Sequence, residues 1–543
     1  MQRIFTLAVA CCLCLFVGNL NAQPYLTSTY SDISVETNIT YGANYTVLTL
    51  PVTGSTTLRP LQMDLYTPND NTDDQRPLVI LFGTGNFLPQ GVNGGVYGTR
   101  MDSVNVETAM RLAQLGYVVA VADYRLGWDP LSTSQDVRIS TLIGAAYRGQ
   151  QDARSAIRFF KKSVVEGNNP YGICADRISL WGIGTGGYVS LATGYLDEYS
   201  DVLVEKFIGP DINGDGNPDP YVIPSLNSDV EGSTLTTNPL NGDTLNTPAF
   251  SNFSDTDAYD SEVQLVVNVA GAVGDSSWID ENDPPLIAFH VPSDPNAPYM
   301  TSTLIIPTTG EFVVEVSGSY DAVRIANEKG INDALGEDMI DDVWTDAANE
   351  DNDGYDGLFP LTDNIFTNAL GMQAAQSDPY NWWDGPFWMN VPYTDDNDNC
   401  RIPIPMEFCN FDFVTKLSHE VNDAGESRTV IDSMINYFAP RAFNVHDLGS
   451  GCSFMSSTDN LPAEVAQLTA TPNPADEAVI ISTGSDMPMR SVAIFSVEGK
   501  VVSFQNNLSA KQFTFNRRNL PAGMYYVQVR FDAGTATQRV VFK

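Results

Sequence analysis

Leu180-Trp181-Gly182-Ile183-Gly184-Thr185-Gly186-Gly187-Tyr188 is the stretch that decides the fold of this chain. An apolar run ends there in a glycine-rich turn, with glycines two residues before and two residues after a central position. This spacing is typical of a nucleophile elbow, a strand, tight turn and helix whose central side chain meets the substrate. The central residue is Gly184. The sequence therefore predicts the backbone of an elbow in which the nucleophile position is vacant.

The composition indicates a large folded protein with an acidic surface. The chain has 543 residues, 43% of them hydrophobic, and a formal net charge of -39. This length suits a core domain with an accessory domain. The acidic excess repels nucleic acid and anionic membranes, so we exclude nucleic acid as a partner.

Residues 1–22 are predicted to be a secretory signal peptide. Arg3 supplies the positive end, an apolar stretch follows, and Ala22 ends the segment. A lipid anchor is the alternative, although the residues before its candidate cysteines match the required motif poorly. Those cysteines are Cys11, Cys12 and Cys14. No later run reaches the roughly 18 apolar residues that span a membrane, so no transmembrane segment is expected in the mature chain.

Four cysteines remain after the signal peptide: Cys174, Cys400, Cys409 and Cys452. An even number in an exported protein indicates disulfides, with three connectivities open. Cys400 with Cys409 is the local candidate, and four unpaired thiols are the alternative.

Buried strands alternate with amphipathic helices along most of the chain. Continuous apolar runs predict strands at 77–82, 116–125, 177–181, 264–271 and 284–290, and alternation predicts an edge strand at 61–68. Helical periodicity marks residues 110–115, 150–162 and 430–438. This order predicts an α/β fold, a mostly parallel sheet flanked by helices on both sides.

Residues from about 61 to 196 resemble the N-terminal half of an esterase or lipase of the α/β-hydrolase superfamily, which includes the carboxylesterases. Several motifs in order carry the resemblance. They are Asp64-Leu65-Tyr66-Thr67-Pro68, the glycine turn after Phe82, Asp123-Tyr124-Arg125, Gln151-Asp152-Ala153-Arg154-Ser155-Ala156 and Asp176-Arg177-Ile178. The resemblance implies the α/β-hydrolase fold.

The resemblance also implies where the other catalytic groups lie. Asp294 occupies the position of the triad acid, and His419 fits the base because the closing helix follows it. His290 is expected to be structural, and His446 is the weaker alternative for the base. The predicted oxyanion donors are backbone amides at Gly83, Thr84, Gly85 and Thr185. Thr185 and Ser190 are poorly placed to replace the missing nucleophile at Gly184.

Residues 338–416 lack regular periodicity and resemble a lid inserted between the acid and the base. Within them, the aromatic stretch 380–388 has two interpretations. It lines a pocket for an apolar or carbohydrate-like ligand, or it anchors the insert to the domain.

An acidic loop carries the spacing of a calcium site. Its predicted ligands are Asp211, Asn213, Asp215 and Asp219. Val222 stands where an EF-hand has glutamate, which leaves a structural calcium ion as the expectation. No other cofactor is required by these assignments.

Short alternating strands from residue 465 onward predict a small all-β, immunoglobulin-like sandwich. The module resembles the C-terminal sorting domain of type IX secretion cargo. Its matching residues are Pro472-Asn473-Pro474-Ala475, Val497-Glu498-Gly499-Lys500, Leu520-Pro521-Ala522-Gly523-Met524-Tyr525-Tyr526 and Val540-Val541-Phe542-Lys543. The resemblance implies the type IX secretion machinery as a partner and a cell-surface or extracellular location.

The predicted domains are therefore a hydrolase-like domain at 23–455, a linker at 456–464 and a sorting domain at 465–543. The preferred hypothesis is a pseudoenzyme that binds a small molecule, lipid or glycan. An active secreted ester hydrolase with a non-standard site is the first alternative. A surface structural or adhesive protein is the second.

Overall fold

The computed structural model describes residues 23–211, 216–248, 259–305, 312–395, 397–452, 466–484, 487–496, 501–505, 508–517, 520–531 and 534–543. The predicted signal peptide and linker lie outside these residues. Within them, none of the helices is long and apolar enough to cross a membrane.

One eight-stranded sheet organises the larger domain. Its spatial order is β1-β2-β4-β3-β5-β8-β10-β13. The strands are β1 (Ile33–Thr46), β2 (Thr57–Pro68), β3 (Arg76–Phe82), β4 (Val118–Ala122), β5 (Ile173–Ile183), β8 (Leu265–Val269), β10 (Leu286–His290) and β13 (Leu358–Pro360). The strands from β4 to β13 run parallel, while β2 pairs antiparallel with both β1 and β4. The structure confirms the predicted α/β-hydrolase fold class.

The central strands are apolar throughout because both faces of the sheet are covered. In β3, Leu78, Ile80 and Phe82 belong to one hydrophobic core, whereas Val79 and Leu81 belong to the core on the opposite face. Successive side chains of a strand point to opposite faces, so burial on both sides requires an unbroken apolar run.

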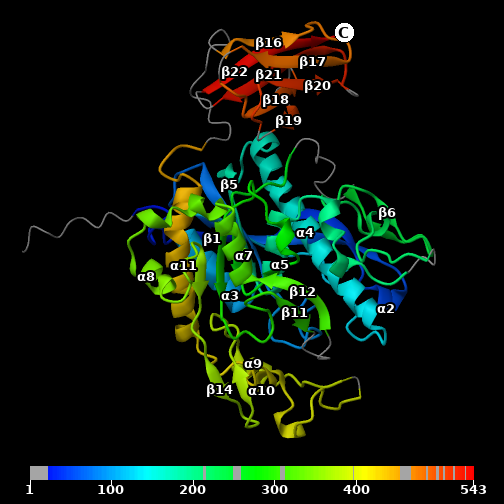
Figure 1. The fold of residues 1–543 in the computed structure, drawn as a ribbon, viewed down its shortest axis with the longest axis vertical. Helices are drawn as coiled ribbons and strands as arrows, with labels where there is room; N and C mark the ends of the chain where they lie inside the picture. The colour runs from blue at the N-terminus through cyan, green and yellow to red at the C-terminus, as the bar shows by residue number, and fades with distance from the viewer. Residues whose placement is uncertain are drawn as a thin grey trace, which may run out of the picture.

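Two sets of helices cover the faces of this sheet (Figure 1). One face packs against α4 (Gln135–Glu166), α5 (Thr185–Tyr195) and α7 (Ser319–Glu328). The other packs against α3 (Ser103–Leu115), α8 (Val343–Asn349) and α11 (Ala424–Val445). The predicted helical stretches fall within α3, α4 and α11.

Smaller elements complete the domain. They are α2 (Leu50–Thr53), α6 (Pro224–Asn227), α9 (Gly385–Trp388), α10 (Phe411–Thr415), β6 (Thr236–Thr237), β7 (Thr244–Asn246), β9 (Ala272–Val273), β11 (Ser302–Ile305), β12 (Phe312–Gly318), β14 (Ile365–Thr367) and β15 (Gln373–Ala375). Short 3-10 helices span Tyr199–Val202, Glu205–Phe207, Ser276–Trp278, Ile331–Leu335, Glu337–Met339 and Met406–Phe408.

The structure differs from the prediction in the place of one strand and in the start of the insert. The segment 61–68 was predicted as an edge strand, but β2 lies between β1 and β4, and the long strand β1 forms the edge. The insert predicted at 338–416 contains β13, which pairs with β10 in the main sheet. The sheet therefore continues to Pro360, and we use "the insert" for residues 361–423, between β13 and α11. The sequence does not predict β13, because three residues are too few to show a periodic pattern.

Two disulfides connect the four cysteines, Cys174 with Cys452 and Cys400 with Cys409. The local candidate from the sequence is thus confirmed, and it lies within the insert. The other bridge joins the start of β5 to the segment after α11.

The C-terminal domain is a β-sandwich of a three-stranded and a four-stranded sheet. Its strands are β16 (Leu468–Thr471), β17 (Ala478–Thr483), β18 (Ser491–Ser496), β19 (Val501–Gln505), β20 (Gln512–Asn516), β21 (Gly523–Phe531) and β22 (Gly534–Phe542). In Figure 1 it lies at one end of the molecule, and the insert elements α9, α10 and β14 lie at the other.

Candidate active site

A strand, a tight turn at Gly184 and a helix follow one another where the sequence predicts an elbow. Gly184 connects β5 to α5 with φ 55° and ψ -117°, a left-handed conformation that favours glycine. The flanking glycines are required by packing. A β-carbon at Gly182 would overlap the carbonyl oxygen of Gly186, and one at Gly186 would overlap the carbonyl oxygen of Phe82.

The side chain of Thr84 lies directly beside Gly184. A β-carbon at Gly184 would overlap Thr84 Oγ1 and would lie 2.8 Å from Thr84 Cβ. That approach is closer than β-carbons make in folded proteins. The sequence predicts only a backbone amide from Thr84, because its side chain comes close to Gly184 only through the pairing of β3 with β5.

Three of the four residues predicted to supply oxyanion donors, Thr84, Gly85 and Thr185, line the cavity at the elbow, whereas Gly83 does not. Within the described residues, neither the backbone amide of Thr84 nor that of Thr185 donates a hydrogen bond. The Tyr124 hydroxyl donates to the carbonyl of Gly83 at 2.9 Å and lies 3.0 Å from Thr185 Oγ1. Tyr124 therefore holds the glycine turn and the elbow together, and it engages the Thr185 hydroxyl.

His419 is buried in the insert directly before α11. Its Nδ1 lies 2.9 Å from Asp378 Oδ1, and its Nε2 lies 3.2 Å from Gln376 Nε2. With the Gln376 amide donating to Nε2, Nδ1 carries the proton and donates to Asp378. His419 and Asp378 therefore form a hydrogen-bonded pair, and a carboxylate on Nδ1 is the arrangement that orients the histidine in a catalytic triad.

The predicted acid, Asp294, has other partners. Its Oδ1 accepts hydrogen bonds from the backbone amides of Asn296 and Ala297, and its Oδ2 lies 3.2 Å from His290 Nε2. The structure therefore pairs His419 with a carboxylate other than the predicted one. Asp378 lies 41 residues before His419 in an irregular segment, and no local pattern marks it.

His290 is fully buried at the end of β10. Its Nδ1 lies 2.6 Å from Ser319 Oγ, which also accepts a hydrogen bond from Asn268 Nδ2 at 2.8 Å. The buried network ties α7 to β8 and β10, in line with the structural role expected for His290. Ser190 is also fully buried, one turn into α5.

His446, the weaker alternative for the base, lies after α11. It is buried, and its Nε2 lies 2.7 Å from Ser179 Oγ. Burial and the nearby Arg177 lower the pKa of His446 to about 3. It is therefore neutral at the pH values at which a histidine base works.

The lowered pKa of His446 predicts acid sensitivity. Above about pH 6.5, the pKa of an unfolded imidazole, His446 is neutral in both states and costs no stability. As the pH falls from 6.5 toward 3, the free energy of unfolding decreases. This follows because the unfolded chain binds a proton that the folded chain excludes. His446→Gln should reduce the loss of unfolding free energy between pH 6 and 4 by up to about 1.4 kcal/mol per pH unit. Urea unfolding of both proteins at several pH values measures this, and parallel curves would contradict it.

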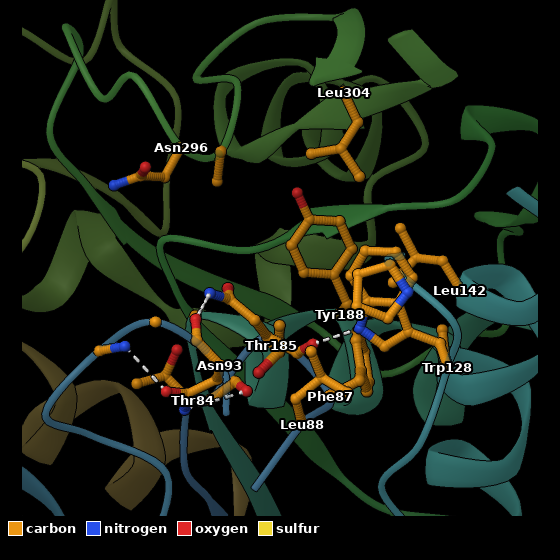
Figure 2. A pocket seen from close by; sticks show the side chains of 18 of the residues that line it. Thr84, Phe87, Leu88, Asn93, Trp128, Leu142, Thr185, Tyr188, Asn296 and Leu304 are labelled. Atoms are coloured by element: carbon orange, nitrogen blue, oxygen red, sulfur yellow. Dashed lines mark hydrogen bonds between the residues drawn. The ribbon is translucent and has the colours of Figure 1, made fainter. Parts of the chain in front are cut away.

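The carboxyl ends of the parallel strands meet at one edge of the sheet, where α/β proteins bind their ligands. A cavity of about 1270 Å³ lies there. Its lining includes Thr84, Gly184, Thr185, Asp294 and His419. Figure 2 shows Thr84, Thr185 and Tyr188 around it, with Asn296 and Leu304 on the opposite wall. The fold thus gathers Gly184, Asp294 and His419 in one cavity, although Asp294 and His419 belong to separate pairs.

The aromatic stretch of the insert contributes to the cavity wall and to the packing of the insert. Tyr380 lines the cavity, whereas the Trp383 indole donates to Asp412 Oδ1 at 2.9 Å and packs edge-on against His419. Trp383 therefore helps to anchor the insert around the base.

The calcium site stays a prediction. Asn213 and Asp215 lie outside the described residues, and Asp211 Oδ2 accepts a hydrogen bond from the backbone amide of Gly216 at 2.8 Å. Among the residues that the structure describes, no cluster of three or more potential metal ligands is present.

Two family models match the chain. Residues 63–307, which include the elbow and Asp294, match the family described as BD-FAE. Residues 470–543 match the family described as a secretion system C-terminal sorting domain. A search of curated proteins gives no match.

Solved structures similar to this chain include two esterases. Thermogutta terrifontis esterase 2 phosphorylated by paraoxon is 17% identical, with 49% of this chain and 73% of that chain covered and a TM-score of 0.26. A truncated form of a carbohydrate esterase from gut microbiota is 16% identical, with 56% and 86% covered and a TM-score of 0.30. From the family matches and the fold, the chain is an esterase-like α/β-hydrolase domain joined to a C-terminal sorting domain for type IX secretion to the cell surface or extracellular space.

Proposed function

We propose that this protein is a secreted pseudoenzyme, which binds a ligand in the esterase-like cavity and does not form an acyl-enzyme. The observation that carries the proposal is the pairing of Gly184 with Thr84. Gly184 offers no nucleophile, and the Thr84 side chain fills the space that a β-carbon at position 184 would need.

The rest of the site supports binding. The cavity is somewhat larger than a typical small-molecule pocket, and the Asp378–His419 pair and the amides of Thr84 and Thr185 line it. Polar groups of this kind orient a ligand's oxygen atoms, whether or not a covalent step follows. The sorting domain brings this cavity to the outside of the cell, where its ligand would be met.

The test uses the purified chain with 4-nitrophenyl butyrate and with a fluorophosphonate, which modifies activated hydroxyl nucleophiles. We expect no burst of nitrophenol and no covalent adduct by mass spectrometry, because covalent catalysis requires an activated nucleophile. Thr185→Val and Ser190→Ala serve as matched controls, and both should behave like the parent chain.

A stoichiometric burst, or an adduct on a residue that lines the cavity, would overturn the proposal in favour of a hydrolase with a non-standard nucleophile. Loss of that burst in Thr185→Val alone would identify Thr185 as the nucleophile. Saturable binding of 4-nitrophenyl butyrate without a burst would support the proposal over a purely adhesive role.

A further inference from the structure

The carboxylate of Asp378 is a negative charge on the cavity wall. Asp378 lines the cavity, and its side chain is 21% exposed. Its Oδ1 accepts a hydrogen bond from His419 Nδ1, and its Oδ2 accepts one from Asn381 Nδ2, each at 2.9 Å. Both donors are neutral, because Nε2 of His419 accepts from the Gln376 amide. A carboxylate has about four acceptor sites, so Asp378 can still accept a hydrogen bond from a group inside the cavity.

No protein cation balances this charge in the part of the chain that the structure describes, where neither a lysine nor an arginine forms an ion pair with Asp378. Charge-assisted hydrogen bonds are stronger than those between neutral groups. The exposed carboxylate is therefore a favourable contact for a positively charged ligand.

The other charges of the lining also favour a cation. Asp294 and Asp395 line the same cavity, whereas Arg401 is the only lysine or arginine among the lining residues that the structure describes. The Arg401 guanidinium donates to the backbone carbonyls of Thr394 at 2.9 Å and Gly91 at 3.3 Å. The lining thus attracts a cation and repels an anion.

Aromatic rings surround Asp378. Tyr97 and Tyr380 line the cavity, and burial together with the negative charge of Asp378 raises the pKa of both hydroxyls well above the ordinary value. The Trp383 ring packs edge-on against His419 and against Tyr97, with centroids 5.0 and 6.1 Å apart. The face of an aromatic ring attracts a cation, and aromatic cages are a recurrent means of binding ammonium groups.

An organic cation suits this place better than a metal ion. Asp378 supplies a single carboxylate, and the described residues contain no group of three or more His, Cys, Asp or Glu side chains able to hold a metal. The cavity of about 1270 Å³ is far larger than an ion, and much of its lining is apolar. Figure 2 shows Phe87, Trp128 and Tyr188 in this lining. These side chains suit the apolar body of an organic ligand.

From these observations we infer that the cavity binds an organic ammonium ion, a protonated amine on an apolar body. The ammonium group donates a hydrogen bond to Asp378 and lies against the rings of Tyr97 and Tyr380. The inference deepens the proposed function and rests on it, because it names the class of ligand that the cavity binds without a covalent step.

Calorimetric titration of the purified chain at pH 7 tests the inference. The probes are 2-phenylethylamine and hexylamine, which are protonated at this pH, their neutral counterparts 2-phenylethanol and hexanol, and the anions 3-phenylpropanoate and hexanoate. We expect at least one amine to bind at least about tenfold more tightly than its alcohol, because hydrogen bonds to charged groups are the stronger ones. The anions should bind more weakly than the alcohols.

Variants locate the ammonium group. Asp378→Asn removes the charge and keeps the shape and the acceptor for His419, so it should reduce the affinity for that amine at least about tenfold and leave the alcohol nearly unchanged. Asp378→Ser is the second neutral variant, for use if the first does not fold by circular dichroism. Asp341→Asn is the matched control, because it removes the same charge from an exposed position outside the cavity lining, and it should bind every probe like the parent chain.

The outcomes separate this inference from the proposed function. Binding of neither amine, equal binding of amine and alcohol, or a preference for the amine that survives the neutral variants at position 378 would overturn the ammonium assignment. A preference lost equally in Asp341→Asn would do the same, because it would then depend on net charge. A preference for the amine that requires Asp378, together with a burst from 4-nitrophenyl butyrate, would support the ammonium site and overturn only the proposed pseudoenzyme.

Discussion

The double variant Thr84→Gly/Gly184→Ser is expected to hydrolyse short activated esters on the order of 10²-fold faster than the parent chain, the lower range for a positioned acid or base. Gly184→Ser alone should gain much less. The reason is steric, since the backbone at Gly184 already has the elbow conformation but a β-carbon there would overlap the Thr84 side chain. Removing that side chain makes room for a hydroxyl beside the amides of the glycine turn.

The measurement is the initial rate with 4-nitrophenyl acetate, together with fluorophosphonate labelling at position 184. Thr84→Gly alone is the control for a change in cavity shape. Adding His419→Ala to the double variant should remove the gain if His419, which is hydrogen-bonded to Asp378, acts as the predicted base. A folded double variant without labelling would contradict the placement of His419 as the base for this position.

The second large effect concerns stability. Asp152→Ala should lower the free energy of unfolding by about 3–5 kcal/mol, the usual cost of removing one partner from a buried ion pair. Asp152 accepts hydrogen bonds from the backbone amide of Arg125 at 2.7 Å and from its Nε at 2.9 Å. Both side chains are almost fully buried, at 2% and 0% exposure for Arg125 and Asp152. The variant leaves the Arg125 charge buried without its carboxylate.

Urea unfolding at pH 7 measures this loss. Glu328→Ala is the matched control, because its ion pair with Arg324 is exposed and should contribute less than about 1 kcal/mol. A loss below 1 kcal/mol for Asp152→Ala would show that the pair is not important for stability. Arg125 directly follows Tyr124, whose hydroxyl contacts both the glycine turn and the elbow.

Strong local patterns account for what was predictable about the fold. β3, β4, β5, β8 and β10 were all expected, because strands buried on both faces must be continuously apolar. The glycines at 182 and 186 were expected at the elbow, and their close packing explains why no side chain is accommodated there. The position of β2 in the sheet was predicted wrongly. An alternating pattern is the same for a strand at the edge and for a strand with neighbours on both sides, and β1 pairs with the outer side of β2.

The candidate site was predictable where its residues follow a strand or precede a helix. Gly184 and Asp294 follow β5 and β10, and His419 precedes α11, so the order of elements places all three at the same edge of the sheet. The partners of these residues were not predictable. Asp378 and Gln376 reach His419 from an irregular part of the insert, and an irregular backbone carries no periodicity from which a contact can be inferred.

The amino-acid sequence by itself determined the α/β-hydrolase fold, the glycine-rich turn between β5 and α5 and the sorting domain, because consecutive residues carry the apolar runs, the glycine spacing and the strand pattern that predict them. The tertiary structure decided which carboxylate pairs with His419 and how Thr84 fills the space beside Gly184. These depend on distances between side chains that are far apart along the chain, and only packing brings them together.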